Sequence, residues 1–283
     1  MVGLVALIAP IPGMPPVAPI LAQHGAAKAE RPDGNTLVRP SLILEHSALV
    51  PGETSYLGVR LVMHDSWHVY WRNHGDSGLP PQITFEAVEG LTIGQPQWPT
   101  PERYITGGEV LDYIYENEVT LIFPVAVSPS LKPGSTVTIR AQLEWLVCKE
   151  MCLPGEATVE LSAPVAASAS VGTQARYFEH ARARHPVPID KASIPVGVAW
   201  EGHTLVLSSP QADELTFFPY ESDADVYPQD MIASGHRKAG ELRLRYNEGV
   251  EDVASVDGVL VVRRDGKAYH VLIKAPTERP SGS

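Results

Sequence analysis

Short runs of alternating apolar and polar residues, separated by turn-forming clusters, extend along most of this chain. Such alternation is typical of β-strands with one buried face, and turn signals at this spacing indicate antiparallel strands. The chain also has 26 prolines in 283 residues, and proline breaks helix interiors because it lacks a backbone donor. The sequence therefore predicts an all-β fold. The predicted strands are 42–46, 55–63, 119–127, 136–147 and 157–161, then 196–200, 204–207, 215–218, 241–246, 258–263 and 268–273.

One helix separates these strands into two groups. Residues 173–185 have an apolar face that includes Tyr177 and Phe178, and Thr173 is a residue type that caps helix N-termini. We therefore predict two tandem β-sandwiches with the Tyr177 and Phe178 face of the helix docked between them. The predicted segments are 1–35 (N-terminal segment), 36–165 (first sandwich), 166–193 (linker and helix), 194–276 (second sandwich) and 277–283 (tail).

The N-terminal segment is apolar up to residue 22. Residues 2–9 resemble the apolar part of a secretion signal, although the basic residues that precede such a part are missing. Prolines make a transmembrane helix implausible here, and no other stretch approaches about 18 uninterrupted apolar residues. We interpret residues 1–35 as a truncated or misassigned export signal or, alternatively, as a disordered apolar tail.

Charge and cysteine content exclude several classes of protein. There are 22 basic and 33 acidic residues, a net charge of −11, whereas nucleic-acid binding needs a basic surface, so we expect no nucleic-acid partner. Two cysteines exclude a disulfide-dense scaffold and a four-cysteine metal site. The sequence also has no Gly-x-Ser-x-Gly, P-loop or dinucleotide-binding motif.

The two cysteines, Cys148 and Cys152, are separated by three residues between two β-rich runs. If these runs form a tight hairpin, directly opposed residues lie about 4.5–5.5 Å apart at Cα, which is within the range of a disulfide. A bridge across so short a loop constrains the unfolded chain little. It does let one thiol resolve a mixed disulfide formed at the other.

Three interpretations of this pair remain open from the residues alone. The pair is redox-active, or it is an inert clamp on a hairpin, or it forms a copper(I) site in which Met151 supplies a third sulfur. Lys149 favours the thiolate form of a neighbouring cysteine and Glu150 opposes it, so we do not predict a strongly acidic thiol.

Three blocks of sequence carry a family resemblance: 145–157 around the cysteines, the aromatic stretch 67–81, and 97–104. In this order they resemble the N-terminal periplasmic region of the DsbD/ScsB (suppressor of copper sensitivity) thiol:disulfide interchange family. The resemblance covers about 36–164 and is fainter over 194–275. The cysteine spacing is shorter than in the archetypal DsbD.

The resemblance implies an immunoglobulin-like fold and a protein-disulfide reductase type of activity, with no cofactor besides the redox-active disulfide. We therefore expect two tandem immunoglobulin-like β-sandwich domains joined by a short helix, with catalytic Cys148 and Cys152. The implied partners are a membrane-embedded electron-donor domain and periplasmic thioredoxin-fold proteins. The family's membrane and C-terminal thioredoxin-like domains are missing here, so we expect either an excised region or a stand-alone periplasmic protein.

The family also has a mobile cap loop over the disulfide, and 99–118 is the comparable stretch. It supplies Tyr104, Tyr113 and Tyr115 as candidates for an aromatic cap; alternatively these tyrosines pack on the sandwich surface. A separate cluster of His64, His68 and His74 is a weaker candidate for a metal site.

Two rival functions use other features of the chain. One is a periplasmic copper(I)-binding or copper-tolerance module that uses Cys148, Met151 and Cys152, and the other is a non-redox adaptor. The second predicted sandwich, 194–276, contains no cysteine. We expect it to position the first sandwich or to bind a partner, and to move with it as one fairly rigid body.

Overall fold

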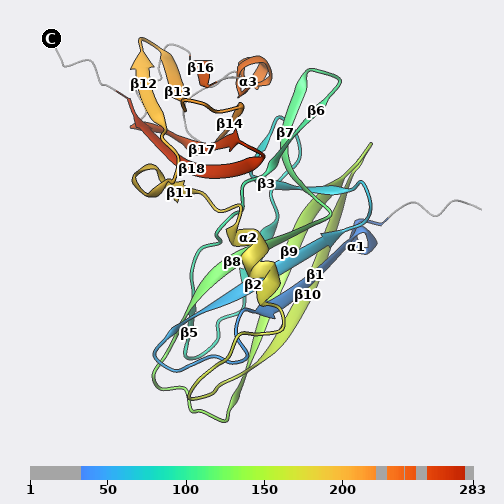
Figure 1. The fold of residues 1–283 in the computed structure, drawn as a ribbon. Coiled ribbons are helices and arrows are strands. Elements are labelled where there is room, and N and C mark those ends of the chain that lie inside the picture. The colour runs from blue at the N-terminus through green and yellow to red at the C-terminus, as the bar shows by residue number, and fades with distance from the viewer. Residues whose placement is uncertain (1–32, 221–227, 239, 247–253, 278–283) are drawn as a thin grey trace, which may run out of the picture. The chain divides into compact units, whose positions relative to one another are not determined.

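The structure is a computed structural model that describes residues 33–220, 228–238, 240–246 and 254–277. Most of the predicted N-terminal segment and the end of the tail lie outside these residues. Within them the fold is mostly β, as predicted, with the strands in four sheets. Figure 1 shows the order of the elements along the chain.

The first two sheets come from the predicted first sandwich. One has the order β1-β2-β8-β5, and the other has the order β10-β9-β3-β7-β6, with β4 also paired to β9. Their strands are β1 (Val38–Leu44), β2 (Thr54–Met63), β3 (His68–Gly75), β4 (Gln82–Phe85), β5 (Leu91–Ile93), β6 (Glu102–Thr106), β7 (Val110–Glu116), β8 (Glu118–Val127), β9 (Thr136–Cys148) and β10 (Cys152–Pro164). The short helix α1 (Gly34–Leu37) precedes β1.

The other two sheets come from the second group of predicted strands. One has the order β11-β18-β17-β14-β15 and the other β12-β13-β16. Their strands are β11 (Val187–Pro188), β12 (Gly197–Glu201), β13 (Thr204–Ser208), β14 (Glu214–Pro219), β15 (His236–Arg237), β16 (Glu241–Arg245), β17 (Ser255–Arg264) and β18 (Lys267–Pro276). The remaining helices of the described chain are α2 (Ala175–Arg182), α3 (Pro228–Ser234) and the 3-10 turn η1 (Ile189–Lys191).

Strand β9 shows how the alternating pattern builds the core. Its odd-numbered residues from Ile139 to Val147 are buried, while Arg140, Gln142 and Glu144 between them are exposed. Because successive side chains of a strand point to opposite faces, one face of β9 joins the interior and the other meets solvent.

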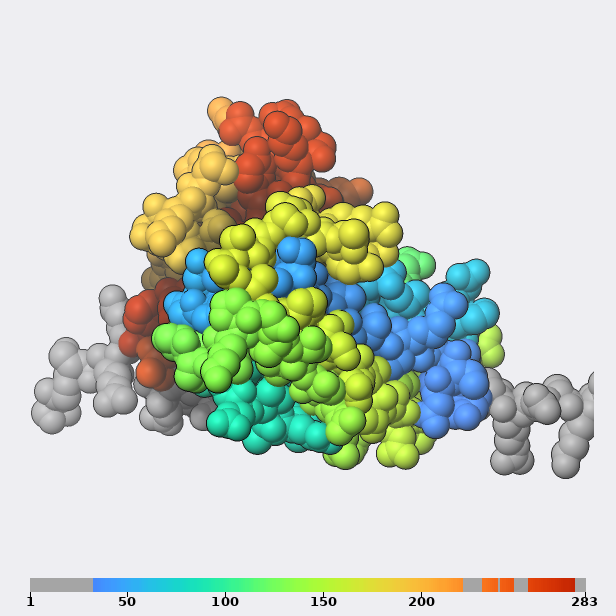
Figure 2. Space-filling view, turned by 90° about the horizontal axis from the view of Figure 1, so that it is seen from below, coloured from blue at the N-terminus to red at the C-terminus, as the bar shows by residue number. Residues whose placement is uncertain are grey.

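Helix α2 is shorter than predicted and packs elsewhere. It begins at Ala175 after an N-cap at Gln174 that makes no side-chain cap, so Thr173 does not cap it. Phe178 is fully buried in one cluster with Ile43 of β1 and Ile122 of β8. The helix therefore lies on the first sheet instead of between two sandwiches (Figure 1), and Figure 2 shows its yellow segment on the surface beside blue residues.

Side chains from the two groups of sheets contact each other. Trp71 of β3 lies 6.3 Å from Phe218 and 5.4 Å from Tyr220 between ring centroids. The Asn73 amide donates a hydrogen bond of 2.8 Å to the carbonyl of Pro219. Strand β3 therefore links the first group of sheets to β14.

Candidate active site

The hairpin of β9 and β10 carries both cysteines at its tip. Cys148 ends β9, Cys152 begins β10, and the two are directly paired with 4.1 Å between their Cα atoms. A disulfide joins them. In the turn, the backbone N–H of Lys149 donates to the carbonyl of Met151. The predicted hairpin with opposed cysteines is therefore confirmed.

The two cysteines differ in accessibility. Cys148 has only 3% of its surface exposed, whereas Cys152 is an exposed residue. Exchange requires that the incoming sulfur reach the sulfur it joins. Cys152 is therefore the sulfur that a partner can reach.

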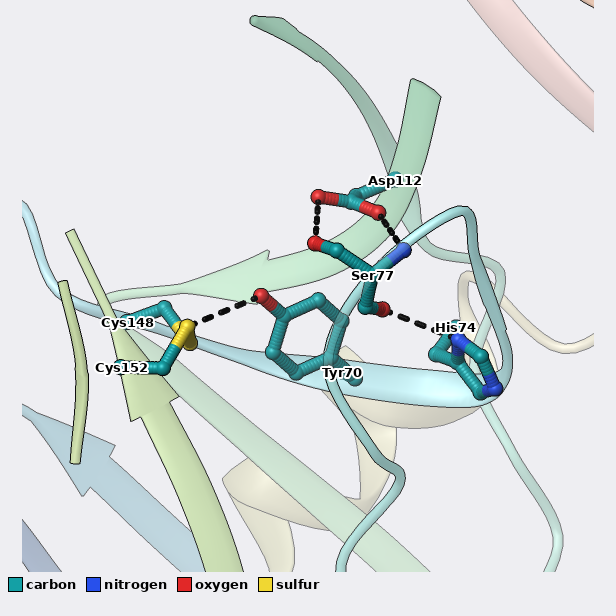
Figure 3. Close-up of a disulfide and its surroundings, with 6 residues drawn as sticks. All are labelled: Tyr70, His74, Ser77, Asp112, Cys148 and Cys152. Carbon is teal, nitrogen blue, oxygen red and sulfur yellow. Dashed lines mark hydrogen bonds between the residues drawn. A yellow bond between two sulfur atoms is a disulfide. The ribbon is translucent and has the colours of Figure 1, made fainter. Parts of the chain in front are cut away.

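Tyr70 of β3 lies against this disulfide. Its hydroxyl is 3.7 Å from Sγ of Cys152 (Figure 3). Tyr70 is 1% exposed, and this burial raises the pKa of its phenol. The hydroxyl stays protonated and can donate a hydrogen bond to a thiolate at Cys152, which stabilises the reduced form of that sulfur.

The loop after β3 holds the Tyr70 ring in place. Asp112 of β7 accepts hydrogen bonds from the backbone N–H and the hydroxyl of Ser77, at 2.8 and 2.7 Å (Figure 3). Gly78 follows with a φ of +73°, and its backbone packs closely against the Tyr70 ring. A Cβ at this position would lie 2.0 Å from a ring carbon of Tyr70. Only glycine fits this position without moving the ring.

We expect Gly78→Ala to displace Tyr70 and to cost more than about 1 kcal/mol in the free energy of unfolding. Gly107→Ala is the matched control: Gly107 also has a positive φ, of +62°, but a Cβ there would have nothing within 4 Å. Urea unfolding of both variants measures the difference. Equal destabilisation would contradict the contact between Gly78 and the ring.

His68 lies on β3, the strand next to β9, which ends at Cys148. It is directly paired with Cys148 across β3 and β9, and it is 2% exposed. Its ring centroid is 5.5 Å from that of Tyr70 and 4.9 Å from that of Tyr104. Burial lowers the pKa of His68, while the charge of Asp112 opposes this shift. His68 is therefore neutral at neutral pH.

Only one of the three predicted cap tyrosines lies on the disulfide's face of the sheet. Tyr104 is half-buried beside the cluster of Tyr70, Ile114 and Cys148. Residues 113 and 115 alternate with Ile114, so Tyr113 and Tyr115 point to the interior, with 3% and 1% exposure. Neither covers the disulfide, and Tyr104 is the remaining candidate.

The predicted residues of the turn are all exposed. Lys149 and Glu150 face solvent, and Met151 is 56% exposed. The copper(I) alternative uses the sulfurs of Cys148 and Cys152 as ligands. In this structure these two sulfurs are joined to each other in the disulfide.

The three histidines of the predicted cluster are spread over different environments. His64 is exposed before β3, His68 is buried, and Nδ1 of His74 lies 2.9 Å from the carbonyl oxygen of Ser77 (Figure 3). Among the described residues, no three His, Cys, Asp or Glu side chains gather in a metal-binding arrangement.

Sequence reasoning missed Tyr70 and Asp112. Tyr70 is two residues from His68, so both lie on one face of β3, and this face is shared with Cys148 through the pairing of His68. Had residues 68–75 been predicted as a strand next to β9, this parity would have placed Tyr70 near the cysteines.

Residues 35–164 match the family model described as "Thiol:disulfide interchange protein DsbD, N-terminal". This stretch belongs to the DsbD N-terminal domain family. The DsbD stretch contains both cysteines, Tyr70 and His68. No curated protein matches the chain.

Among the solved structures that are similar to this chain are two periplasmic domains. The N-terminal periplasmic domain of ScsB from Proteus mirabilis has 15% identity and a TM-score of 0.53, and the match covers 85% of this chain and 92% of that one. This likeness extends past the DsbD stretch and shows a shared fold. The Neisseria meningitidis DsbD N-terminal domain in the reduced form has 16% identity and a TM-score of 0.29, with 47% and 90% covered. Within the described residues no helix is long and apolar enough to cross a membrane.

Proposed function

We propose that this protein is a periplasmic thiol–disulfide electron relay. In this proposal a membrane-embedded donor domain of the DsbD type reduces the Cys148–Cys152 disulfide, and the resulting dithiol reduces disulfides of thioredoxin-fold proteins. The single observation that carries the proposal is the disulfide at a hairpin tip, with Cys152 exposed and in contact with the Tyr70 hydroxyl. Membership of residues 35–164 in the DsbD N-terminal family supports it.

The exchange proceeds in two steps. The Cys152 thiolate attacks a partner disulfide, forms a mixed disulfide and releases one partner sulfur as a thiolate. The Cys148 thiolate then attacks Sγ of Cys152, which re-forms the intramolecular bond and releases the second partner sulfur. Two electrons pass to the partner, and each released partner thiolate takes up a proton.

We take the two pairs of sheets to be two immunoglobulin-like domains with the predicted limits 36–165 and 194–276. The second contains no cysteine, so its proposed role is to position the first domain or to bind a partner.

Trapping the mixed disulfide tests the relay. We expect a Cys148→Ser variant to form a stable, reductant-sensitive adduct with an oxidised thioredoxin-fold protein, because Cys152 is free to attack and Cys148 is unable to resolve. Cys152→Ser is the matched control and should trap little. If neither variant traps such a protein, and the wild-type pair stays oxidised down to about −300 mV, the disulfide is an inert clamp.

A further inference from the structure

The second step of exchange depends on the loss of a proton from a buried sulfur. Cys148 is 3% exposed, so in the reduced protein its thiol is largely shielded from water. A thiol must lose its proton before it attacks, and burial in apolar surroundings disfavours the thiolate. A basic group beside Cys148 would speed this step by taking up the proton.

His68 is the side chain placed for this role. Strand β3 lies between β9 and β7, and His68 is directly paired with Cys148 on one side and with Glu116 on the other. Directly opposed residues of antiparallel strands share a face, with Cβ atoms about 4.5–5.5 Å apart. The imidazole therefore lies next to the side chain of Cys148.

The ring has a free acceptor nitrogen. Within the described part of the chain, neither ring nitrogen of His68 has a hydrogen-bond partner. Since burial keeps the ring neutral, one nitrogen can accept a proton.

The other titratable groups that face His68 are less suited to the role. Asp112 already accepts two hydrogen bonds from Ser77, and burial keeps Tyr70 protonated. Tyr104 offers only a phenol oxygen and has no basic nitrogen. Glu116 lies across His68 from Cys148, on β7. The negative charge of Asp112 does favour an imidazolium once it forms.

We propose that His68 is the proton acceptor for Cys148 in the resolving step. The S–H bond of Cys148 breaks and its proton moves to a ring nitrogen of His68. The thiolate then forms the S–S bond to Cys152 and breaks the bond from Cys152 to the partner sulfur. When the disulfide is reduced, the reverse transfer occurs: the S–S bond breaks, Cys148 leaves as a thiolate, and the imidazolium of His68 returns the proton to it. This inference rests on the proposed relay, because resolution occurs only during exchange.

The reagent dithiobis(nitrobenzoate) separates the two steps. Attack by Cys152 releases one nitrothiobenzoate, and resolution by Cys148 releases a second, so a stopped-flow trace has two phases. We expect His68→Gln to leave the first phase unchanged and to slow the second on the order of 100-fold at neutral pH. The second phase of the variant should rise about tenfold per pH unit toward alkaline pH, where the thiol ionises unaided.

His64→Gln, at an exposed position off the sheet, is the matched control and should keep both phases. A second phase in His68→Gln with the wild-type rate and pH profile would overturn the proposal. The proposal would also be overturned if the first and second phases slowed by the same factor in His68→Gln and in the smaller variant His68→Asn, because that result indicates a structural role for His68. The reagent replaces the protein partner, so the result does not depend on the trapping experiment that tests the relay.

Discussion

In the reduced protein, Cys152 should react with iodoacetamide on the order of 100-fold faster than Cys148. Cys152 is exposed and lies 3.7 Å from a hydroxyl that can stabilise its thiolate, whereas Cys148 is 3% exposed. The alkylation rates of the Cys148→Ser and Cys152→Ser variants, each with one remaining thiol, measure the difference directly.

The same two variants in concentrated urea provide the control for this measurement. There the burial is lost, and the two rates should agree within a few-fold. Equal rates in the native state would show that the two sulfurs are equally accessible after reduction. That result would remove the basis for assigning the attacking role to Cys152.

Acid should destabilise the protein between about pH 6.5 and pH 4, through two histidines near the contacts between the two groups of sheets. Burial, with a smaller contribution from Arg182, lowers the pKa of His185 to about 4. Burial, with Arg184 and Arg263 nearby, lowers the pKa of His270 to about 4. His270 also bonds to Thr100 of the first group, with Nδ1 2.8 Å from the hydroxyl oxygen.

The sign of this dependence follows from the direction of the shifts. The unfolded chain takes up protons on these histidines near pH 6.5, before the folded protein does. Their contribution to stability is therefore complete above pH 6.5 and is lost as the pH falls toward 4. Allowing for partial exposure to solvent, the expected loss is on the order of 3 kcal/mol in total.

Urea unfolding at a series of pH values measures this loss. Combined His185→Gln and His270→Gln substitutions should flatten the dependence between pH 6.5 and 4, while His180→Gln, at an exposed site on α2, should not. The carboxylate of Glu45, whose pKa Arg182 lowers from 4.5, begins to lose its contribution only near pH 4.5, at the acid end of this window. An unchanged slope in the double variant would contradict the assignment.

The parts of the fold that were predictable are those with local signals. The cysteine hairpin follows from two β-rich runs around a three-residue turn, and the hairpin of β17 and β18 follows from Asp265-Gly266, which adopt φ values of 51° and 72°. Strands β3 and β7 were not predicted. Residues 68–71 and 111–115 are buried without interruption, so these strands lack the apolar–polar alternation that identifies a half-buried strand.

The candidate site was predictable to the same extent. The cysteines come from a local pattern, but the choice among three tyrosines depends on which residues of β7 face the disulfide, and this parity is set by pairing with β3. The predicted N-terminus of α2 was wrong. Thr173 has a capping side chain, yet the first turn starts after Gln174.

Strand β3 has a consequence for how this protein can be divided for study. The family match ends at residue 164, but Trp71 and Tyr113 make ring contacts with Phe218, and Trp71 also contacts Tyr220. An expression fragment cut at the family boundary would present these two large aromatic side chains to water. Trp71 is on β3, the strand that also carries His68 and Tyr70, and Tyr113 is on the neighbouring β7. Loss of solubility in such a fragment would then reflect aggregation through an exposed hydrophobic patch and not misfolding of the cysteine hairpin.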